Sequence, residues 1–376
     1  MSDVINIKRS AKVASARERL KMAKGTTQHI KVRNLRKVYQ VRSGMFGRPL
    51  PLQAIAGVSF EVEAGTTFGL VGESGSGKTT IAKMLMLAEA PTSGAIEVGG
   101  RDLTKLDGAA RLQAYRELQP VLQDPYSSLN PRMRVGQIID EPLRIHLSLS
   151  RHERQARVRE LLDLVGLPSD AAERYPNEFS GGQRQRISIA RALGLNPKCL
   201  ILDEPVSALD VSIQAQVLNL LKELQQRIGL TYLLISHDLA VVAYMSQRVG
   251  VLYLGELMEI ADADDIVRRP LHPYTQALIS SVDSRGSDDN GKVVITGEIP
   301  SPINPPSGCP FHPRCPRAEH RCTLEKPVLR QLASGHQAAC HFAEGFLQSY
   351  TKQRLARDQS SAESSSSPNS NTEVTT

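Results

Sequence analysis

Three short runs of hydrophobic residues predict the central strands of an α/β domain. Cys199–Leu202 and Tyr232–Ile235 are apolar throughout, and Gln214–Arg227 between them has the pattern of a helix. Runs of this length are typical of buried parallel strands joined by a crossover helix. Thr67–Val71 predicts a further strand, which leads through a glycine-rich turn into a helical stretch from about Lys78 to Ala88. A strand, a glycine loop and a helix in this order open a nucleotide-binding α/β domain.

The surrounding pattern predicts further strands and a helical region. Residues 29–40 alternate between apolar and polar side chains as a strand does, and Val58–Val62 predicts another strand. Ser43–Pro51 is rich in glycine and proline, which predicts a loop. Residues 107–178 are largely helical in pattern, and Arg151–Val165 is the clearest helix among them.

Composition divides the chain of 376 residues into four parts. We expect a basic N-terminal arm at 1–28, an ATPase-sized domain at 29–283, an extension at 284–348 and a serine-rich tail at 349–376. The arm is either a solvated end or a weak attractor of anionic lipid or RNA. Its basic residues are Lys8, Arg9, Lys12, Arg17, Arg19, Lys21 and Lys24.

Composition and charge also exclude some classes of function. Trp is absent and aromatic residues make up 4% of the chain, so an aromatic platform for single-stranded nucleic acid is not expected. The net charge of +7 lies largely in the arm, and we expect no specific nucleic-acid partner. No run reaches the roughly 18 apolar residues of a membrane span, and the N-terminus lacks the apolar core of a signal peptide. The sequence therefore predicts a cytoplasmic protein.

The segment Gly72-Glu-Ser-Gly-Ser-Gly-Lys78-Thr79 matches the phosphate-binding motif G-x-x-x-x-G-K-[ST]. Its glycines let backbone N–H groups surround a phosphate, and the following helix N-terminus adds a favourable dipole. We expect Lys78 to reach the β- and γ-phosphates and the Thr79 hydroxyl to bind Mg²⁺. A chance glycine-rich turn is the alternative. The predicted ATP-binding residues here are Gly72, Ser74, Gly75, Ser76, Gly77, Lys78, Thr79 and Thr80.

Two acids follow the apolar run 199–202 at the end of its predicted strand. Asp203 would hold Mg²⁺, and Glu204 would accept a proton from the attacking water. His237, after the next predicted strand, would contact the γ-phosphate or orient Glu204, and Gln123 would sense Mg²⁺ or the water. Taken alone, a His at a strand end more often has a structural role, and Gln123 alone is equally unremarkable.

The segment Phe179-Ser-Gly-Gly-Gln-Arg-Gln-Arg186 resembles the signature motif of ABC ATPases. The family's motif order is complete here, because Ser207-Ala-Leu-Asp210 lies between Glu204 and His237. This resemblance covers about residues 29–283. It implies a P-loop NTPase of the ABC type, in which a RecA-like core carries an antiparallel β subdomain and a helical subdomain at about 124–190.

The same resemblance implies a head-to-tail dimer of ATPase domains. ATP on the loop of one subunit would be capped by Ser180, Gly181, Gly182 and Gln183 of the other. Tyr39 matches the aromatic residue that stacks on adenine, and Asp210 belongs to the nucleotide-binding set. The region Gln123–Val135 would contact the coupling helices of a permease.

Further segments resemble the ATP-binding subunits of oligopeptide, dipeptide and nickel importers. They are His272-Pro-Tyr-Thr-Gln-Ala-Leu278, Gly297-Glu-Ile-Pro-Ser-Pro302 and Gly308-Cys-Pro-Phe-His-Pro-Arg-Cys315. The segments around 44–47 and 130–132 resemble the second, or F-type, ATPase of dipeptide importers. This likeness implies a heterodimer, two transmembrane permease subunits and an extracytoplasmic solute-binding protein. Phe179, where Leu is commoner, and the serine-rich tail depart from the pattern.

Cysteines are concentrated in the extension. Cys309, Cys315, Cys322 and Cys340 have neither zinc-ribbon nor standard ferredoxin spacing. The resemblance implies a [4Fe-4S] cluster, with zinc and unligated packing thiols as alternatives. Cys199, within an apolar run, is expected to be a core residue.

Taken together, these motifs predict an ABC importer ATPase that acts at the cytoplasmic face of the membrane on peptides or a related solute. The alternative is a non-transport ABC ATPase acting on ribosomes or DNA. Ribosome-acting members usually carry two ATPase units, and DNA-repair members carry a long coiled coil between the phosphate loop and the signature. This chain shows no second unit, and Thr79 and Ser180 are only about a hundred residues apart. A fused exporter would need membrane spans.

Overall fold

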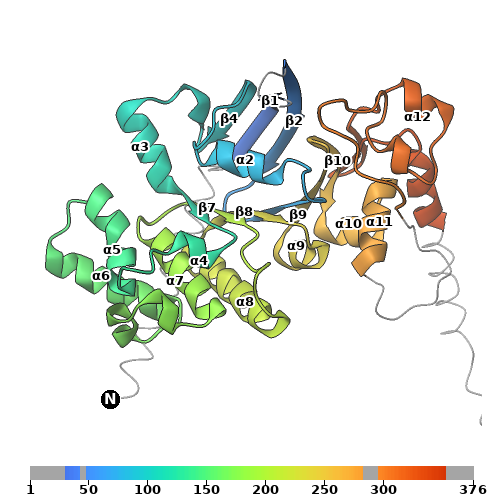
Figure 1. Ribbon diagram of the computed structural model, residues 1–376. Coiled ribbons are helices and arrows are strands. Elements are labelled where there is room, and N and C mark those ends of the chain that lie inside the picture. The colour runs from blue at the N-terminus through green and yellow to red at the C-terminus, as the bar shows by residue number, and fades with distance from the viewer. Residues whose placement is uncertain (1–29, 43–47, 283–294, 353–376) are drawn as a thin grey trace, which may run out of the picture.

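The computed structural model describes residues 30–42, 48–282 and 295–352 (Figure 1). The predicted basic arm at 1–28 and most of the predicted tail at 349–376 lie outside these residues. The boundary at 283/284 also lies outside them, and the four-part division of the chain stays a prediction.

A large mixed sheet forms the centre of the molecule, with strand order β11-β12-β10-β9-β3-β8-β7-β6. Its inner strands are parallel, as the apolar runs predicted: Cys199 pairs with Thr231 and Thr67 with Tyr232. All residues of β3, β7 and β8 are buried, because helices cover both faces of a parallel sheet. The bounds are β3 Thr67–Val71, β6 Leu118–Val121, β7 Cys199–Asp203, β8 Thr231–Ser236, β9 Arg248–Tyr253, β10 Glu256–Asp262, β11 Arg330–Ala333 and β12 His336–Ala338.

A second, antiparallel sheet has the order β2-β1-β4-β5. The predicted loop Ser43–Pro51 was too long, because Pro49–Pro51 already belong to β2 and pair with β1. β2 is an edge strand, where the missing N–H of proline costs no ladder hydrogen bond. The bounds are β1 Ile30–Arg42, β2 Pro49–Val62, β4 Ser93–Val98 and β5 Arg101–Asp102.

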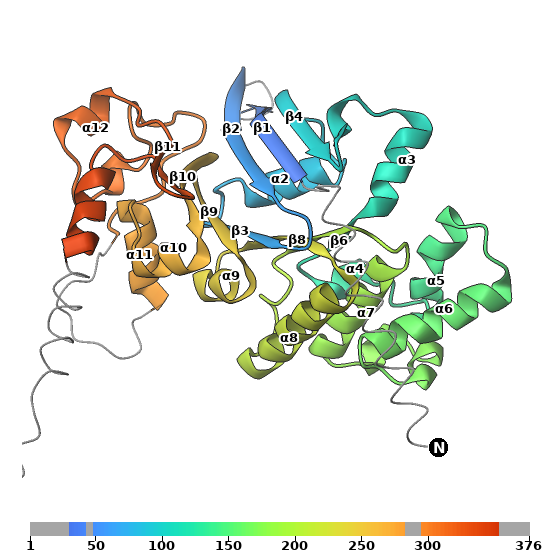
Figure 2. The same ribbon diagram turned by 180° about the vertical axis from the view of Figure 1, so that it is seen from behind.

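Helices lie on both faces of the large sheet. Figure 1 shows α2 on the side of the antiparallel sheet and α7, α8 and α9 on the opposite side, and the reverse view in Figure 2 agrees. The bounds are α2 Lys78–Leu85, α3 Gly108–Glu117, α4 Pro125–Ser128, α5 Val135–His146, α6 Arg151–Leu164, α7 Gly181–Leu193, α8 Val211–Ile228, α9 Leu239–Met245, α10 Ala263–Arg268, α11 Pro273–Val282 and α12 His320–Leu324. Short 3₁₀ helices are Leu103–Lys105, Ser169–Glu173, Pro176–Glu178 and His312–Arg314.

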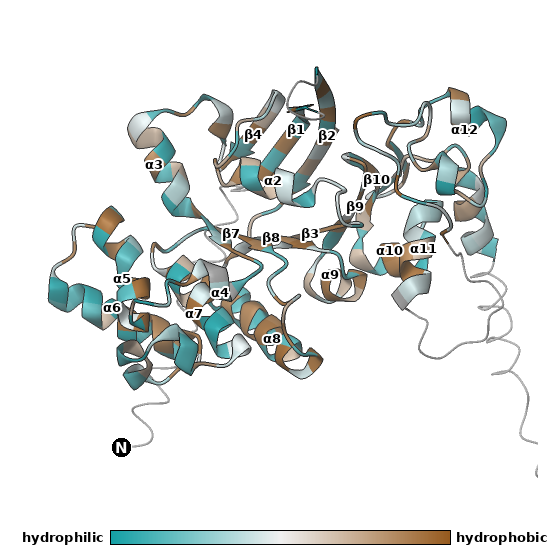
Figure 3. Cartoon of the chain, in the orientation of Figure 1, coloured by the Kyte–Doolittle hydropathy of each residue, from teal (hydrophilic) through white to brown (hydrophobic). Residues whose placement is uncertain are grey.

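Helices α4 to α7 gather at one end of the molecule, in the region predicted to be helical. Ser150 is the N-cap of helix α6, and its side chain forms a reciprocal capping box with Glu153. Gly166, in a left-handed conformation, follows the end of the helix. Figure 3 shows α6 coloured mostly as hydrophilic, and only Val158, Leu161 and Leu162 of this helix are buried. The prediction that 107–178 is largely helical did not include Leu118–Val121, which forms strand β6 at the edge of the large sheet.

Residues after 295 extend the large sheet through β12, which pairs with β10. The buried Glu259 carboxylate of β10 ties this part together by accepting the N–H groups of Leu271 and His272 at 2.7 and 3.0 Å. The His336 ring of β12 lies 2.7 Å from the same carboxylate. The C-terminal segment therefore continues the large sheet.

Candidate active site

The loop Gly72–Thr79 connects β3 to α2 at the C-terminal edge of the parallel strands. Gly77 has a φ of 106°, and a Cβ at this position would lie only 2.7 Å from the Ala54 carbonyl oxygen. The left-handed conformation and the close backbone both require glycine here. The conformation of the loop at Gly77 is therefore fixed by neighbouring backbone atoms.

Lys78 begins α2, and its ammonium group lies over the loop. Its Nζ donates to the carbonyl oxygens of Gly72 and Glu73 at 2.7 and 2.9 Å. Burial lowers the pKa of Lys78, and the negative charges of Glu204, Asp203 and Glu73 partly oppose this shift. The surrounding carboxylates favour the charged form of the Lys78 ammonium, and this positive charge is what would attract a phosphate.

Asp203 is the last residue of β7 and is 7% exposed. Its Oδ1 is buried and has no hydrogen-bond partner among the described residues. Burial raises its pKa, and the neighbouring Glu204 charge raises it further. A buried carboxylate oxygen of this kind has the chemistry of a Mg²⁺ ligand.

Glu204 contacts two other residues that the sequence predicted for the site, Gln123 and His237. Its carboxylate accepts a hydrogen bond from Gln123 Nε2 at 3.1 Å, and its other oxygen lies 3.1 Å from His237 Nδ1. Its backbone is fixed at a φ of 48° and donates to the Ile235 carbonyl oxygen at 2.8 Å. The structure thus brings together residues from three separate segments around one carboxylate.

Tyr39 lies on β1, and its hydroxyl donates to the Glu89 carboxylate. Lys37 Nζ lies 4.9 Å from the centre of its ring. Burial is the main cause of its raised pKa, and Thr80 of α2 also interacts with its hydroxyl. Tyr39 is therefore close to the helix that carries the phosphate loop.

The predicted signature residues form the start of α7. Ser180 caps this helix: its Oγ accepts from the Gln183 N–H at 3.4 Å, and Gln183 Oε1 accepts from the Ser180 N–H at 3.0 Å. Gly182 packs against α8, where a Cβ would lie 2.3 Å from Ile213 Cγ2. Helices α7 and α2 lie on opposite faces of the sheet in Figures 1 and 2. Asp210, at the start of α8, has an exposed side chain.

Two residues that contact the phosphate loop were not predicted from the sequence to belong to the site. Arg314 makes a bidentate contact with the Glu73 carboxylate, and the Tyr274 hydroxyl accepts from the Glu73 N–H at 2.9 Å. Glu73 and Arg314 are 241 positions apart, so no local pattern links them.

The comparisons with known proteins match both parts of the chain. Residues 55–207 match the family model described as ABC transporter, and residues 258–322 match that of the oligopeptide/dipeptide transporter, C-terminal region. The oligopeptide transport ATP-binding protein AppF of Bacillus subtilis is 50% identical over 317 residues, covering 83% of this chain and 96% of that protein. The chain belongs to the ATP-binding subunits of ABC transporters.

Other members of this ABC family support the same assignment. The di/tripeptide transport ATP-binding protein DppF of Pseudomonas aeruginosa is 49% identical over 316 residues, covering 84% of this chain and 98% of that protein. A dimeric ATP-binding cassette, MJ0796, bound to ADP and Pi, is similar with a TM-score of 0.55 and 28% identity, covering 62% of this chain and 98% of that one. The predicted ABC-type P-loop fold is confirmed.

Membership of the ABC family establishes the coarse activity of the chain. It is an ATPase coupled to transport that uses ATP with Mg²⁺, and it acts with separate permease subunits. Within the part of the chain that the structure describes, no helix is both long and apolar enough to cross a bilayer.

The four cysteines of the ABC subunit's extension line one small cavity, together with His312 and His341. All four are free thiols, and burial raises the pKa of Cys309 to about 12 and of Cys340 to about 11. Among the described residues, no group of three or more His, Cys, Asp or Glu is arranged to hold a metal ion. The predicted iron–sulfur cluster thus has a shared cavity of thiols but no metal-binding arrangement to support it. Cys199 is a buried core residue, as predicted.

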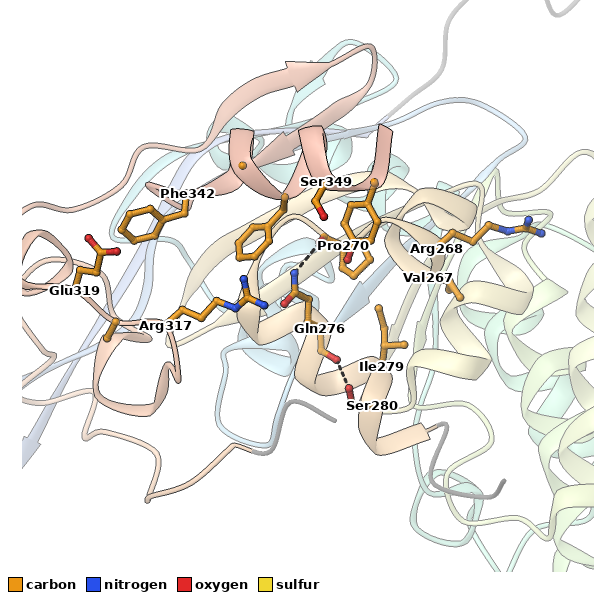
Figure 4. A pocket seen from close by; sticks show the side chains of 14 residues that line it. Val267, Arg268, Pro270, Gln276, Ile279, Ser280, Arg317, Glu319, Phe342 and Ser349 are labelled. Atoms are coloured by element: carbon orange, nitrogen blue, oxygen red, sulfur yellow. Dashed lines mark hydrogen bonds between the residues drawn. The ribbon is translucent and has the colours of Figure 1, made fainter. Parts of the chain in front are cut away.

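A larger cavity of about 860 Å³ lies away from the phosphate loop, between α10, α11 and the helical segment 343–352. Figure 4 shows Gln276 and Arg317 pointing into it. Gln276 is held there by a hydrogen bond of 3.1 Å to the Pro270 carbonyl oxygen. No sequence-predicted site residue lines this cavity.

Proposed function

We propose that this ABC subunit powers the import of peptides, with ATP bound at Gly72–Thr79. The observation that carries the site is the meeting of Gln123, Glu204 and His237 beside Lys78 and Asp203. This arrangement supports Lys78 as the cation for phosphate, Asp203 as the carboxylate for Mg²⁺ and Glu204 as the general base, at one edge of the sheet. The C-terminal region and the peptide-transport relatives support peptides as the solute.

The geometry supports a distinct role for each residue. Lys78 would leave the Gly72 and Glu73 carbonyl groups to bind the β- and γ-phosphates, while Thr79 and Asp203 hold Mg²⁺. Glu204 would take the proton of the attacking water, oriented by His237 and with Gln123 at the water or metal. The backbone of the loop, with Ser74, Gly75, Ser76, Gly77 and Thr80, would surround the phosphates, and Tyr39 would stack on adenine.

The exposed side chains of Ser180 and Gln183 at the start of α7 support the proposed dimer. Ser180, Gly181, Gly182 and Gln183 would cap ATP held by a second ABC ATPase subunit, with Asp210 close to the same interface. The resemblance of the segments around 44–47 and 130–132 to F-type subunits favours a partner that is a different chain. The region Gln123–Val135 would dock on two permease subunits at the cytoplasmic face of the membrane, and a solute-binding protein would deliver the peptide.

Reconstitution of the assembled importer in liposomes tests this function. We expect peptides, delivered by the binding protein, to be taken up with ATP and to stimulate phosphate release. Lys78→Ala should abolish both, whereas Lys105→Ala, an exposed lysine, should change neither. Uptake of a non-peptide solute alone would refute the solute assignment, and normal turnover by Lys78→Ala would refute the proposed site.

We also propose that Cys309, Cys315, Cys322 and Cys340 hold a [4Fe-4S] cluster. The supporting observation is that all four thiols line one cavity, and four thiolates are the usual ligands of such clusters. The described thiols are not arranged as a metal site, so binding would have to draw them together. A bound cluster would act as a structural brace for the extension.

Protein purified without oxygen should contain iron and sulfide in equal amounts, about four of each per chain. Cys322→Ser should lose them and Cys199→Ser should retain them. Failure to bind iron and sulfide on anaerobic reconstitution, or zinc in their place, would overturn this proposal.

A further inference from the structure

Two side chains of the matched C-terminal region, residues 258–322, contact the phosphate loop, one through an ion pair and one through a hydrogen bond. Arg314 Nη1 and Nη2 donate to the two carboxylate oxygens of Glu73 at 2.6 and 3.2 Å. The Tyr274 hydroxyl accepts the Glu73 backbone N–H at 2.9 Å. Because Lys78 holds the Glu73 carbonyl oxygen, this residue is fixed at its side chain, its N–H and its carbonyl group.

The groups that hold Glu73 are themselves fixed by burial. The Arg314 side chain is 8% exposed and that of Glu73 is 25% exposed, so water screens this pair only partly. Tyr274 and Phe311 are fully buried and pack on Tyr253, with ring centres 4.8 and 5.3 Å from it. Arg314 therefore projects from a packed aromatic cluster, which limits its freedom to move.

The extension also has a rigid connection to the sheet that carries the loop. Strand β12 pairs with β10, and the Ala339 N–H donates to the Met258 carbonyl oxygen at 2.8 Å. Strand β10 pairs with β9, and β9 pairs with β3, which leads directly into the phosphate loop. Arg314 and the loop are thus held on a common framework.

The charge of Glu73 explains why this contact bears on nucleotide binding. An unpaired carboxylate in the loop would repel the triphosphate, and Arg314 supplies the compensating charge. When Lys78 moves to the phosphates, Arg314 and Tyr274 still hold Glu73 in place. We propose that Arg314 and Tyr274 are positioning residues, through which the C-terminal region 258–322 sets the affinity of the phosphate loop for ATP.

This inference rests on the proposed nucleotide site, and its test separates the two. In the assembled importer, Arg314→Met should raise the KM for ATP roughly tenfold, by leaving one charge uncompensated, while kcat stays within about twofold. Arg321→Met is the matched control, since it breaks an exposed Arg–Glu pair of the same extension, and its KM should be unchanged. Tyr274→Phe, which removes only the hydroxyl, should raise KM by about threefold.

Rescue distinguishes a charge effect from a loss of folding. Adding Glu73→Gln to Arg314→Met removes the uncompensated charge and should return KM to within about threefold of the parent value. The proposal is overturned if Arg314→Met leaves KM unchanged, or if kcat and Tm fall together and Glu73→Gln restores nothing. If Lys78→Ala still binds ATP normally, the nucleotide site itself is misplaced, whatever the Arg314 result.

Discussion

Replacing Glu204 by Gln removes one negative charge from the proposed site and preserves the shape of the side chain. In the parent protein, the two carboxylate oxygens face Gln123 Nε2 and His237 Nδ1, each at 3.1 Å. A Gln at 204 keeps one amide oxygen for one of these contacts, and rotation of the Gln123 amide can satisfy the other. We therefore expect folding to be retained.

The effect on turnover follows from the loss of the base. A positioned general base is worth roughly 10²–10⁴-fold in rate, and an amide cannot accept the proton of the attacking water. We expect kcat to fall by about that range, which corresponds to roughly 3–5 kcal/mol in the activation free energy. ATP affinity should be retained or increased, because a charge near the triphosphate is lost.

The assay is phosphate release by the assembled importer, with the other ATPase site inactivated so that its turnover does not contribute. ATP binding and Tm are measured on the same samples. Glu223→Gln, which changes an exposed glutamate of α8, is the matched control and should behave as the parent. Turnover within threefold of the parent in Glu204→Gln would refute the role of Glu204.

Three further predictions concern the loop, the extension and the core. Gly77→Ala would place a Cβ 2.7 Å from the Ala54 carbonyl oxygen at a φ of 106°, so titration with ATP should show at least a roughly tenfold weaker affinity. Phe311→Ala removes a fully buried ring and should destabilise the fold by about 3–5 kcal/mol, seen in denaturant unfolding, whereas Leu324→Ala, at an exposed position, should have little effect. Burial raises the pKa of Cys199 to about 12, so alkylation followed by mass spectrometry should leave this thiol unmodified at pH 8 until the protein unfolds. Rapid modification of Cys199 in the folded protein would contradict its burial.

Site residues could be predicted from the sequence where they lie within a local pattern that also defines a strand, a turn or a helix. The loop around Lys78 needs glycines at fixed positions between a strand and a helix, so its pattern could be recognised without a structure. The apolar runs that became β7 and β8 are buried on both faces, which leaves a clear signal. Glu204 followed from the same signal, because it comes directly after a buried strand.

Tertiary contacts explain what the sequence did not predict. Strand β6 has four residues, includes Pro120 and follows a helix without a glycine between them. It forms by pairing with β7, a contact between residues about 80 positions apart. Arg314 is a further case, since its partner Glu73 is distant in sequence and only the folded extension brings them together.

The central claim is that ATP lies between the phosphate loop of one subunit and the signature segment of another. An electron cryo-microscopy structure of the assembled importer, carrying Glu204→Gln and saturated with ATP and Mg²⁺, tests it most directly. We expect Ser180 and Gln183 to lie within hydrogen-bond distance of the γ-phosphate held by the partner subunit, and Lys78 of this chain to contact the second nucleotide. A nucleotide-bound assembly in which Ser180–Gln183 contact no triphosphate would contradict it.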